Sequence, residues 1–447
     1  MDRPRNTSLL QNSLCVVNFP HFLMRTEVAG GHFWHDRSVE TEITPAMTND
    51  STKPTVAYKF MDRWNVVQHE LMPELEARWG AMTPKLERLI HILDWVRIEE
   101  FVAGSWCGTG RPPHERAWLA NAFVAKTVLN LPTTVALIDR LTVDRSLWRL
   151  CGFPACKKLP SEATWSRAFE EFADSRLAER VHEALVTEHL GDELIGHISR
   201  DGTAIAARER PRSAAATDAP VTESQAPADE TVEAEPAREN ETSGTVAPTK
   251  PRRGRPRRGE TRQPAAKSSP LARQRGQTLA QMIREIPTAC DRGTKCNAQG
   301  YKVSWNGYKL HLDTADCGVP ISALLSSASM HDSRAAMPLA RMSAARVTNL
   351  YDLMDAAYCS QEIREDSRDL GHVPLIDHNP RRGEKIEFAP HEAIRYNERT
   401  VAERSNARLK DEFGANHLMV KGAPKVMSHL MFGVLVLSAD QLMRLRQ

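Results

Sequence analysis

Three acidic residues in separate parts of the chain have the type and setting of ligands for a divalent metal ion. Asp201 follows "HISR", Asp355 ends the hydrophobic run "LYDLMD", and Glu403 lies in a charged segment. Carboxylates at the strand ends of an open α/β sheet lie where ligands usually bind. Three such oxygen ligands can hold Mg²⁺, and two ions can activate a nucleophile and steady the leaving oxygen of a phosphodiester. We predict that all three acids are catalytic metal ligands, although a single Asp at a strand end is often only a turn former or helix cap.

The charged segment around Glu403 is "RYNERTVAERSNARLKDEFG". Arg399, Glu403 and Lys410 follow Tyr396 by three, seven and fourteen residues. On one continuous helix these side chains would share an arc of roughly 60°. An arginine can clamp a phosphate, a lysine can meet one as a point charge and a tyrosine hydroxyl can donate to one. Tyr396, Arg399 and Lys410 could therefore bind phosphates, and the family resemblance described next implies that these phosphates belong to DNA. The alternative is a surface ion pair between Arg399 and Glu403, which are i,i+4 neighbours.

The same residues resemble a known family, the bacterial insertion-sequence transposases of the DDE class. The spacing of Tyr396, Arg399, Glu403 and Lys410 is similar to the Y-x2-R-x3-E-x6-K signature of that family. "DGT" at Asp201 and "MDAAY" resemble the settings of the first and second catalytic aspartates. "GYKLHLDTAD" with "VPISALLSSASMHDS" resembles the two strands between them, and "GRPPHERAWLANAFVAKTVLNLPTTVALIDRL" resembles the helical N-terminal domain.

The resemblance implies an enzyme that cuts the ends of an insertion sequence and joins them to target DNA. It implies Mg²⁺ or Mn²⁺, as two ions held by the three acids, and double-stranded DNA partners: terminal inverted repeats and target DNA. It also implies a homodimer in the active complex and a place in the bacterial cytoplasm at the nucleoid. Two alternatives stay open: a metal-dependent nuclease of the same fold, and a non-catalytic DNA-binding protein derived from a transposase.

The elements that must position these residues fall into two regions. Residues 58–190 read as an all-helical N-terminal domain for DNA-end binding or dimerisation, preceded by an unpatterned arm over residues 1–57. Residues 191–447 alternate between strands and helices, which predicts a mixed α/β sheet flanked by helices. The resemblance implies that this sheet is a ribonuclease H-like catalytic domain. The segment "PSEATWSRAFEEFADSRLAERVHEALVTEHL" reads as one long helix.

A segment at about 211–290 interrupts the alternation. It has few large apolar residues up to about residue 275, and it changes from acidic between Asp218 and Glu241 to basic between Thr242 and Arg275. Such composition predicts a disordered insertion. It contains "KPRRGRPRRGE", in which Arg253 and Arg255 flank a glycine as in an AT-hook. These arginines could enter an A·T minor groove, or form a merely solvated basic linker.

Other residues carry weaker signals. Arg381 and Arg382, just before the charged segment, are candidates for DNA phosphate contacts or exposed loop charge. Asp332 in "SMHDSR" reads as a helix cap more readily than as a residue near the metals. His182 and His189 share a helical face without a third ligand, so a metal site there is not expected.

Composition sets the remaining limits. The 447 residues carry a net charge of only +2, so any basic surface must be local. The longest apolar run, "LMFGVLVLSA", is about half of a membrane span and fits a buried helix, so no membrane partner is expected. Eight scattered cysteines without a C-x-x-C pair predict free thiols in a reducing compartment.

Overall fold

The fold is taken from a computed structural model of the chain. It describes residues 72–79, 82–102, 114–154, 158–211, 269–296, 299–380 and 384–446. The predicted arm over residues 1–57 and most of the predicted insertion lie outside these ranges.

The N-terminal region is helical, as predicted. Three of its helices begin with a short polar side chain that caps them. Thr83, Thr133 and Asp144 each accept a hydrogen bond from a backbone N–H of the first turn. The helices are α2 (Met72–Trp79), α3 (Pro84–Val96), the 3-10 turn η2 (Ile98–Phe101), α4 (Arg116–Val128), α5 (Thr134–Val143), α6 (Arg145–Leu150), α7 (Glu162–Asp174) and α8 (Leu177–Leu190).

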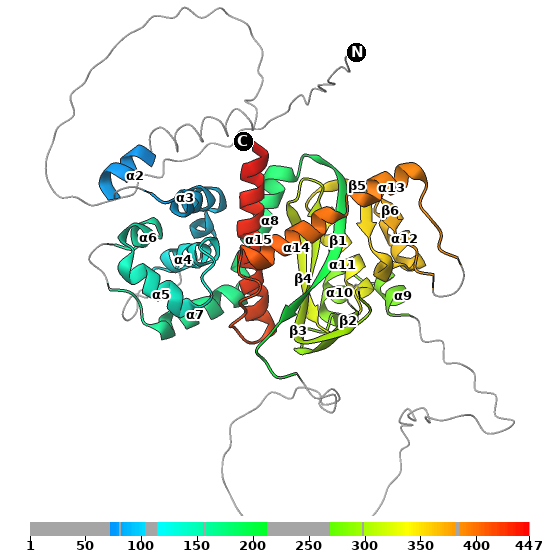
Figure 1. Ribbon diagram of the computed structural model, residues 1–447, viewed down its shortest axis with the longest axis horizontal. Helices are drawn as coiled ribbons and strands as arrows, with labels where there is room; N and C mark the ends of the chain where they lie inside the picture. The colour runs from blue at the N-terminus through cyan, green and yellow to red at the C-terminus, as the bar shows by residue number, and fades with distance from the viewer. Residues whose placement is uncertain are drawn as a thin grey trace, which may run out of the picture.

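The prediction of one long helix up to residue 190 is wrong. The chain leaves the helix at Ser175 and turns at Arg176, which has a left-handed backbone with φ of 51°. Hydrophobic residues continue on both sides of this break, so the pattern of the sequence does not reveal it. The break gives α7 and α8 separate directions in the bundle (Figure 1).

The second region contains a six-stranded mixed sheet, with strand order β2–β3–β1–β5–β6 and β4 paired to β3. β1 lies in the middle: it pairs antiparallel with β3 and parallel with β5. The predicted strands are all present, and β2 is an addition to them. The strands are β1 (Leu194–Ala206), β2 (Asp291–Cys296), β3 (Lys302–Ala315), β4 (Pro320–Ser327), β5 (Thr348–Met354) and β6 (Val373–Ile376).

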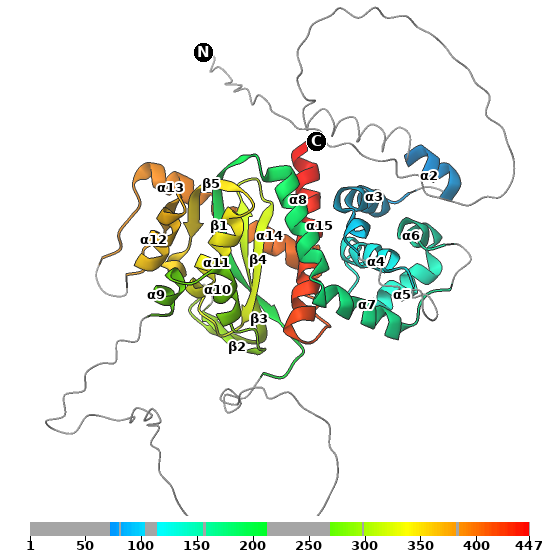
Figure 2. The same cartoon turned by 180° about the vertical axis from the view of Figure 1, so that it is seen from behind.

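Helices cover both faces of this sheet. α11 (Ser333–Ala344) packs on β3 and β4, whereas α14 (Thr400–Asp411) packs on β1 and β3. Figures 1 and 2 show these two helices on opposite faces. All eight residues of β4 are buried, as expected for a strand with both faces covered. α12 (Gln361–Asp369) packs beside α11 and ends before Gly371.

The last helix, α15 (Ala423–Arg446), joins the two regions into one core. It packs against α3, α4, α7 and α8 of the helical region, and also against β4 and α14. Phe432 on α15 lies 5.9 Å from Phe123 on α4, measured between ring centroids. α15 is long and apolar enough to cross a membrane, but 83% of its apolar window is buried inside the protein. The expectation of a buried helix there is confirmed.

The predicted disorder of residues 211–290 is wrong for its C-terminal end. α9 (Pro270–Arg275) and α10 (Leu279–Glu285) are ordered and pack on α11. Both helices begin with a capping side chain, Ser269 and Thr278. Met282 of α10 is fully buried in a cluster with Met354 and Tyr358, which flank Asp355. The few apolar residues of this segment therefore suffice to anchor it.

Candidate active site

Asp201 lies on the central strand of the sheet. It stands opposite Leu312 of β3, and its carboxylate Oδ2 accepts a hydrogen bond of 2.9 Å from Nδ2 of Asn406 on α14. Burial, followed by the negative charge of Asp355, raises the pKa of Asp201 to about 6, against the opposing charge of Arg399.

Asp355 follows the neighbouring parallel strand. Arg200 of β1 pairs with Met354 of β5, so Asp201 and Asp355 are the next residues along two adjacent strands. Asp355 also caps the 3-10 turn η4 (Ala356–Tyr358), because its Oδ1 accepts a hydrogen bond of 2.9 Å from the N–H of Ala357. Burial raises its pKa, and the charge of Arg399 opposes this shift. The sheet thus brings the first two predicted acids together.

Glu403, the third predicted acid, is turned toward an arginine. Its Oε1 lies 2.6 Å from a guanidinium nitrogen of Arg399, and the side chain of Glu403 is 54% exposed. The alternative interpretation, an i,i+4 ion pair, therefore describes the contact that is present. The charge of Glu403 nevertheless raises the pKa of Asp201. Glu403 is therefore near the aspartate pair, without being bound to it.

Arg399 is the shared counter-charge of this cluster. Although burial lowers the pKa of its guanidinium, Tyr396, Glu403 and the two aspartates raise it overall. The guanidinium also lies over the ring of Tyr396, at 5.9 Å from the centroid. One cation therefore faces all three predicted acids and the tyrosine.

Tyr396 and Glu403 are not on one continuous helix, contrary to the prediction. α13 (Pro390–Asn397) ends before Glu398, and α14 begins at Thr400. α13 buries no residue, whereas α14 buries an apolar side from Val401 onward against the sheet. Contact with the sheet thus sets the course of α14 separately from α13. The predicted sharing of one helix face therefore applies only to residues of α14. Tyr396 nevertheless contacts Arg399.

Lys410 lies near the C-terminal end of α14. Burial lowers the pKa of its ammonium and so does the neighbouring Lys295, while the charge of Asp201 opposes the shift. Lys410 is therefore close to Asp201.

Asp332 occupies the N-cap position of α11, but its side chain does not cap the helix as predicted. Its Oδ1 instead accepts a hydrogen bond of 2.8 Å from Nζ of Lys309, and its charge raises the pKa of Asp355. Asp332 is therefore a fourth acid near the cluster. Nε2 of His182 lies within hydrogen-bonding distance of the Ser438 hydroxyl and the Pro320 carbonyl.

Two supporting contacts were not predicted from the sequence. Asn406 holds Asp201, and the only sequence signal is its place three residues after Glu403 on α14. Arg200 and Asp313 form a fully buried bidentate ion pair directly beside Asp201, with both nitrogen–oxygen distances at 2.7 Å. Ser343 adds a third bond to the Asp313 carboxylate. Both contacts join residues far apart in sequence.

Four predicted DNA contacts cannot be placed. Arg253 and Arg255 of the AT-hook-like motif and Arg381 and Arg382 before α13 lie outside the described residues. These predictions stay untested.

The residues present suit a divalent ion in part. Asp201 and Asp355 are two partly buried carboxylates, and the charge of Asp355 raises the proton affinity of Asp201, so a cation between them would relieve the repulsion. Across the part of the chain that the structure describes, no three His, Cys, Asp or Glu side chains converge closely enough to hold a metal. Glu403 instead forms an ion pair with Arg399.

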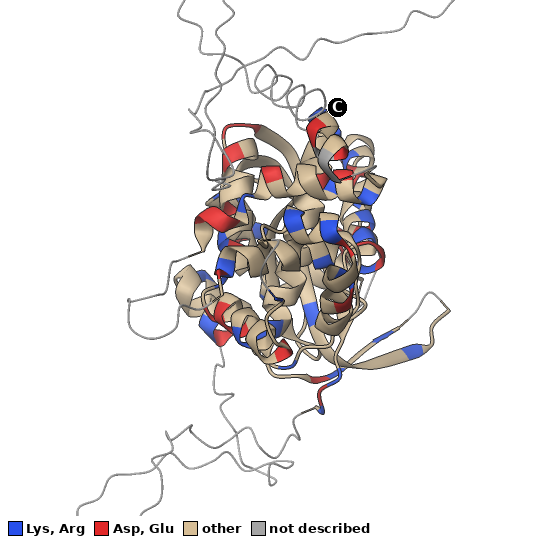
Figure 3. Ribbon diagram, turned by 90° about the vertical axis from the view of Figure 1, so that its left-hand side faces the viewer, with Lys and Arg blue, Asp and Glu red and all other residues tan. Residues whose placement is uncertain are grey.

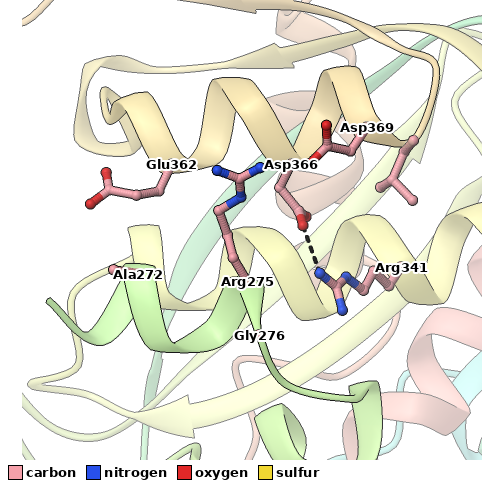
Figure 4. A pocket seen from close by; sticks show the side chains of 8 residues that line it. Ala272, Arg275, Gly276, Arg341, Glu362, Asp366 and Asp369 are labelled. Atoms are coloured by element: carbon pink, nitrogen blue, oxygen red, sulfur yellow. Dashed lines mark hydrogen bonds and ion pairs between the residues drawn. The ribbon is translucent and has the colours of Figure 1, made fainter. Parts of the chain in front are cut away.

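A hollow elsewhere is not part of this cluster. It lies between α9, α11 and α12 and contains the ion pair of Arg341 with Asp366, at 2.7 Å (Figure 4). Arg275 of α9 reaches Asp369 at 2.7 Å across the same hollow. These contacts fix α9 to α12, so we assign the hollow a structural role.

Comparison with known families gives two matches. Residues 74–171 match the family described as Transposase domain (DUF772), and residues 285–438 match the family described as Transposase DDE domain. No curated protein and no solved structure shows significant similarity to the chain. The second match includes Asp355 and Glu403 but begins after Asp201.

Proposed function

Because the chain is a DDE transposase of the insertion-sequence type, we propose that Asp201, Asp355 and Glu403 form its catalytic centre. The family fixes the general activity, which is DNA transposition by cleavage and strand transfer, generally with divalent metal ions. It also implies a ribonuclease H-like fold. The mixed sheet, with β1 between an antiparallel and a parallel neighbour, is consistent with that fold.

One observation carries the assignment of Asp201. The matched DDE domain begins at residue 285, yet β1 lies at the centre of the sheet that this domain forms. The pairing of Arg200 with Met354 sets Asp201 beside Asp355 across the insertion. A long connection of this kind costs little additional loop entropy, because the cost rises only with the logarithm of length.

We assign the metal to this centre as Mg²⁺ or Mn²⁺, in two ions. When bound, such ions supply an activated nucleophile and stabilise the leaving oxygen of the phosphodiester. Asp201 and Asp355 would hold them, with Glu403 as the third ligand. Asn406 keeps one oxygen of Asp201 in place from α14.

Arg399 has two roles in this proposal. In the described state its guanidinium neutralises Glu403 and faces both aspartates. In the complex it would release Glu403 and bind a DNA phosphate, for which its planar donor pair is suited. Tyr396 would donate its hydroxyl proton to a neighbouring phosphate, and Lys410 would meet another as a point charge. No covalent bond between Tyr396 and DNA is needed.

The substrates are the terminal inverted repeats of the element and a target duplex. The helical region, α2 to α8, would bind the ends or form the dimer that holds two of them. We place the protein in the bacterial cytoplasm at the nucleoid, where both DNA partners are found. The apolar α15 does not argue for a membrane, since it is a core helix.

The test uses the purified protein, a duplex with the DNA that flanks its gene, Mg²⁺ and a supercoiled target plasmid. The proposal expects joined products, which disappear in D201A, D355A and E403A while binding of the duplex is retained. Asp192→Ala removes an exposed carboxylate between α8 and β1, outside the centre, and serves as the matched control. Activity retained by any of the three variants would refute the centre, and cleavage without joining would indicate a nuclease instead.

A further inference from the structure

A small hollow lies where the helical region meets the segment that links α14 to α15. Its walls come from α4, the start of α5, α7, residues 417–420 and α15. Its volume is about 40 Å³. One buried water needs about 10–15 Å³, so the hollow has room for about three water-sized atoms. That space suits the oxygens of one phosphate group and is too small for a whole nucleotide.

Aromatic packing brings two basic side chains to this hollow. Phe123 of α4 and Phe169 of α7 lie 5.9 Å and 6.3 Å from Phe432 of α15, measured between ring centroids. Lys126 follows Phe123 by three positions, so the two share one side of α4. His429 precedes Phe432 by the same interval on α15, and both Lys126 and His429 line the hollow. The contact between the two helices therefore fixes a lysine and a histidine at one place.

Lys126 is buried without a partner. The residue is only 9% exposed, and its ammonium forms no hydrogen bond or ion pair with another residue that the structure describes. Burial lowers its pKa to about 8, so the group is still mostly charged at pH 7. A charge removed from water is unfavourable unless an opposite charge or hydrogen-bond acceptors face it. The hollow therefore lacks the anion that such a lysine requires.

The rest of the lining also favours an anion. The described residues around the hollow include no aspartate or glutamate, and the exposed His417 adds a further basic group. Thr133 and Thr134 stand at the start of α5, where backbone N–H groups carry partial positive charge. The hydroxyl of Thr133 accepts a bond from the N–H of Ala136 and can still donate its own proton. A cation, hydroxyl donors and a helix N-terminus together suit a phosphate.

The charges on the surface of the helical region are mixed. Figure 3 looks onto this region and shows basic and acidic residues interspersed along the helices drawn there. The whole chain carries a net charge of only +2. Attraction of an anion to the hollow therefore depends on the groups that line it, and substitution of one of them is a sensitive test.

We propose that the hollow between α4, α5 and α15 is a phosphate-binding site with Lys126 as its central cation. In the complex with DNA the phosphate belongs to the DNA backbone, and this part rests on the proposed function. A phosphate held there would contact both the helical region and the segment that follows α14, and so would position DNA relative to both. Free inorganic phosphate has the same chemistry, and the experiments below separate the two sources. The competing explanation is that Lys126, in the last turn of α4, only stabilises the helix dipole.

The first experiment measures thermal unfolding in EDTA, with inorganic phosphate or with sodium chloride at the same ionic strength. A bound ligand stabilises the folded state, so phosphate should raise the Tm of the natural protein by about 2 °C or more over chloride. Lys126→Met keeps the apolar stem, removes the charge and should abolish most of this excess. Phosphate also stabilises proteins generally by exclusion from their surface. Lys158→Met, which removes an exposed lysine of the same region, is therefore the matched control and should keep the excess.

The two explanations also differ in chloride. An unpaired buried ammonium is unfavourable, so Lys126→Met should be at least as stable there as the natural protein. A helix-dipole role instead predicts a lower Tm in both solutions with an unchanged excess in phosphate, and that outcome would overturn the proposal. Thr134→Val keeps Lys126 and removes a hydroxyl of the lining, so it should reduce the excess. An excess of equal size in all of these variants would also overturn the site.

The second experiment identifies the source of the phosphate. Binding of a fluorescent duplex is followed by anisotropy, in EDTA and at several salt concentrations. If the hollow takes a backbone phosphate, Lys126→Met should lower the magnitude of the slope of log K against log salt by about 0.9, the value for one phosphate. An unchanged slope, together with loss of the phosphate excess in the first experiment, would assign the site to free phosphate.

Failure of this proposal and failure of the proposed function are distinguishable. The first experiment contains neither DNA nor metal ions, so it tests the hollow even if the assigned acids are wrong. If D355A retains cleavage while Lys126→Met loses its response to phosphate, the catalytic assignment is wrong and the phosphate site stands. If D355A abolishes cleavage and Lys126→Met responds to phosphate as the natural protein does, the catalytic centre stands and the hollow is only structural.

Discussion

The buried ion pair beside Asp201 gives the sharpest stability prediction. Arg200 is 1% exposed and Asp313 is 0% exposed, and two bonds of 2.7 Å join them. Burial alone would lower the pKa of the Arg200 guanidinium, but Asp313 and Asp352 outweigh it and raise the pKa. The arginine therefore stays charged in the folded protein. Asp313→Leu would leave that charge buried without its carboxylate.

Breaking a buried pair in this way costs about 3–5 kcal/mol of unfolding free energy. The hydroxyl of Ser343 also loses its acceptor, which favours the upper part of this range. The negative charge of Asp352 continues to stabilise the Arg200 guanidinium and so limits the loss. Arg200→Met should cost a similar amount, because it isolates the Asp313 carboxylate. The double variant R200M/D313L replaces both charges with apolar groups, so it should lie within about 2 kcal/mol of the natural protein.

The assay is urea unfolding of the four proteins, followed by tryptophan fluorescence and by circular dichroism. Coincident transitions from the two probes would justify a single free energy. The expected coupling between the two substitutions exceeds about 3 kcal/mol. Single variants that each cost less than about 1 kcal/mol, or a double variant that costs the sum of the two, would refute the reasoning.

Two further predictions concern protonation. His182 and His311 are fully buried, and burial lowers their pKa values to about 3 and about 4. In the unfolded chain these histidines take up a proton near pH 6.5, whereas in the folded protein they stay neutral to a much lower pH. Their full contribution to the free energy of unfolding is therefore present above pH 6.5 and is lost as the pH falls toward 4. The fall from pH 7 to 5 should be about 2 kcal/mol for each histidine, so urea unfolding of His311→Gln should show a total fall smaller by about 2 kcal/mol than that of the natural protein. An unchanged pH dependence would contradict this. Asn406→Ala removes a hydrogen-bond donor to the carboxylate of Asp201 and should raise the pKa of that carboxylate. The acid limb of a profile of cleavage rate against pH, expected near pH 6, should therefore move to higher pH. A shift to lower pH would rule out a role of Asn406 in keeping Asp201 ionised.

The sequence predicts the elements of the fold well because each has a clear period. The strand of Asp201, the pair β3–β4 and the alternation up to β6 are confirmed. The breaks at Arg176 and Glu398 are missed, because suitable helical residues continue through both. They depend on how the following helices pack, which is tertiary information. The same holds for α9 and α10, where a few buried residues outweigh a polar composition.

The candidate site is predictable in residue type but not in pairing. Asp201 lies on β1 and Asp355 follows the adjacent parallel strand β5, and the placement of both at strands could be inferred from the strand pattern. Asn406 meets Asp201 across 205 positions of sequence, and no local pattern indicates such a contact. The ion pair of Asp332 with Lys309 was also unpredictable, since Asp332 precedes α11 and Lys309 lies on β3. Both require the sheet and its covering helices to be in place first.

The position of α15 bears on how the chain folds during synthesis. Its apolar residues contact helices α3, α4, α7 and α8, which precede it in the chain by more than two hundred residues. The helical region therefore leaves the ribosome with an apolar surface uncovered and waits for a distant segment. Such long-range contacts slow folding and lengthen the exposure of apolar surface to chaperones. A fragment that ends near Leu190 would keep that surface permanently open, and we expect it to aggregate rather than to act as a separate DNA-binding domain.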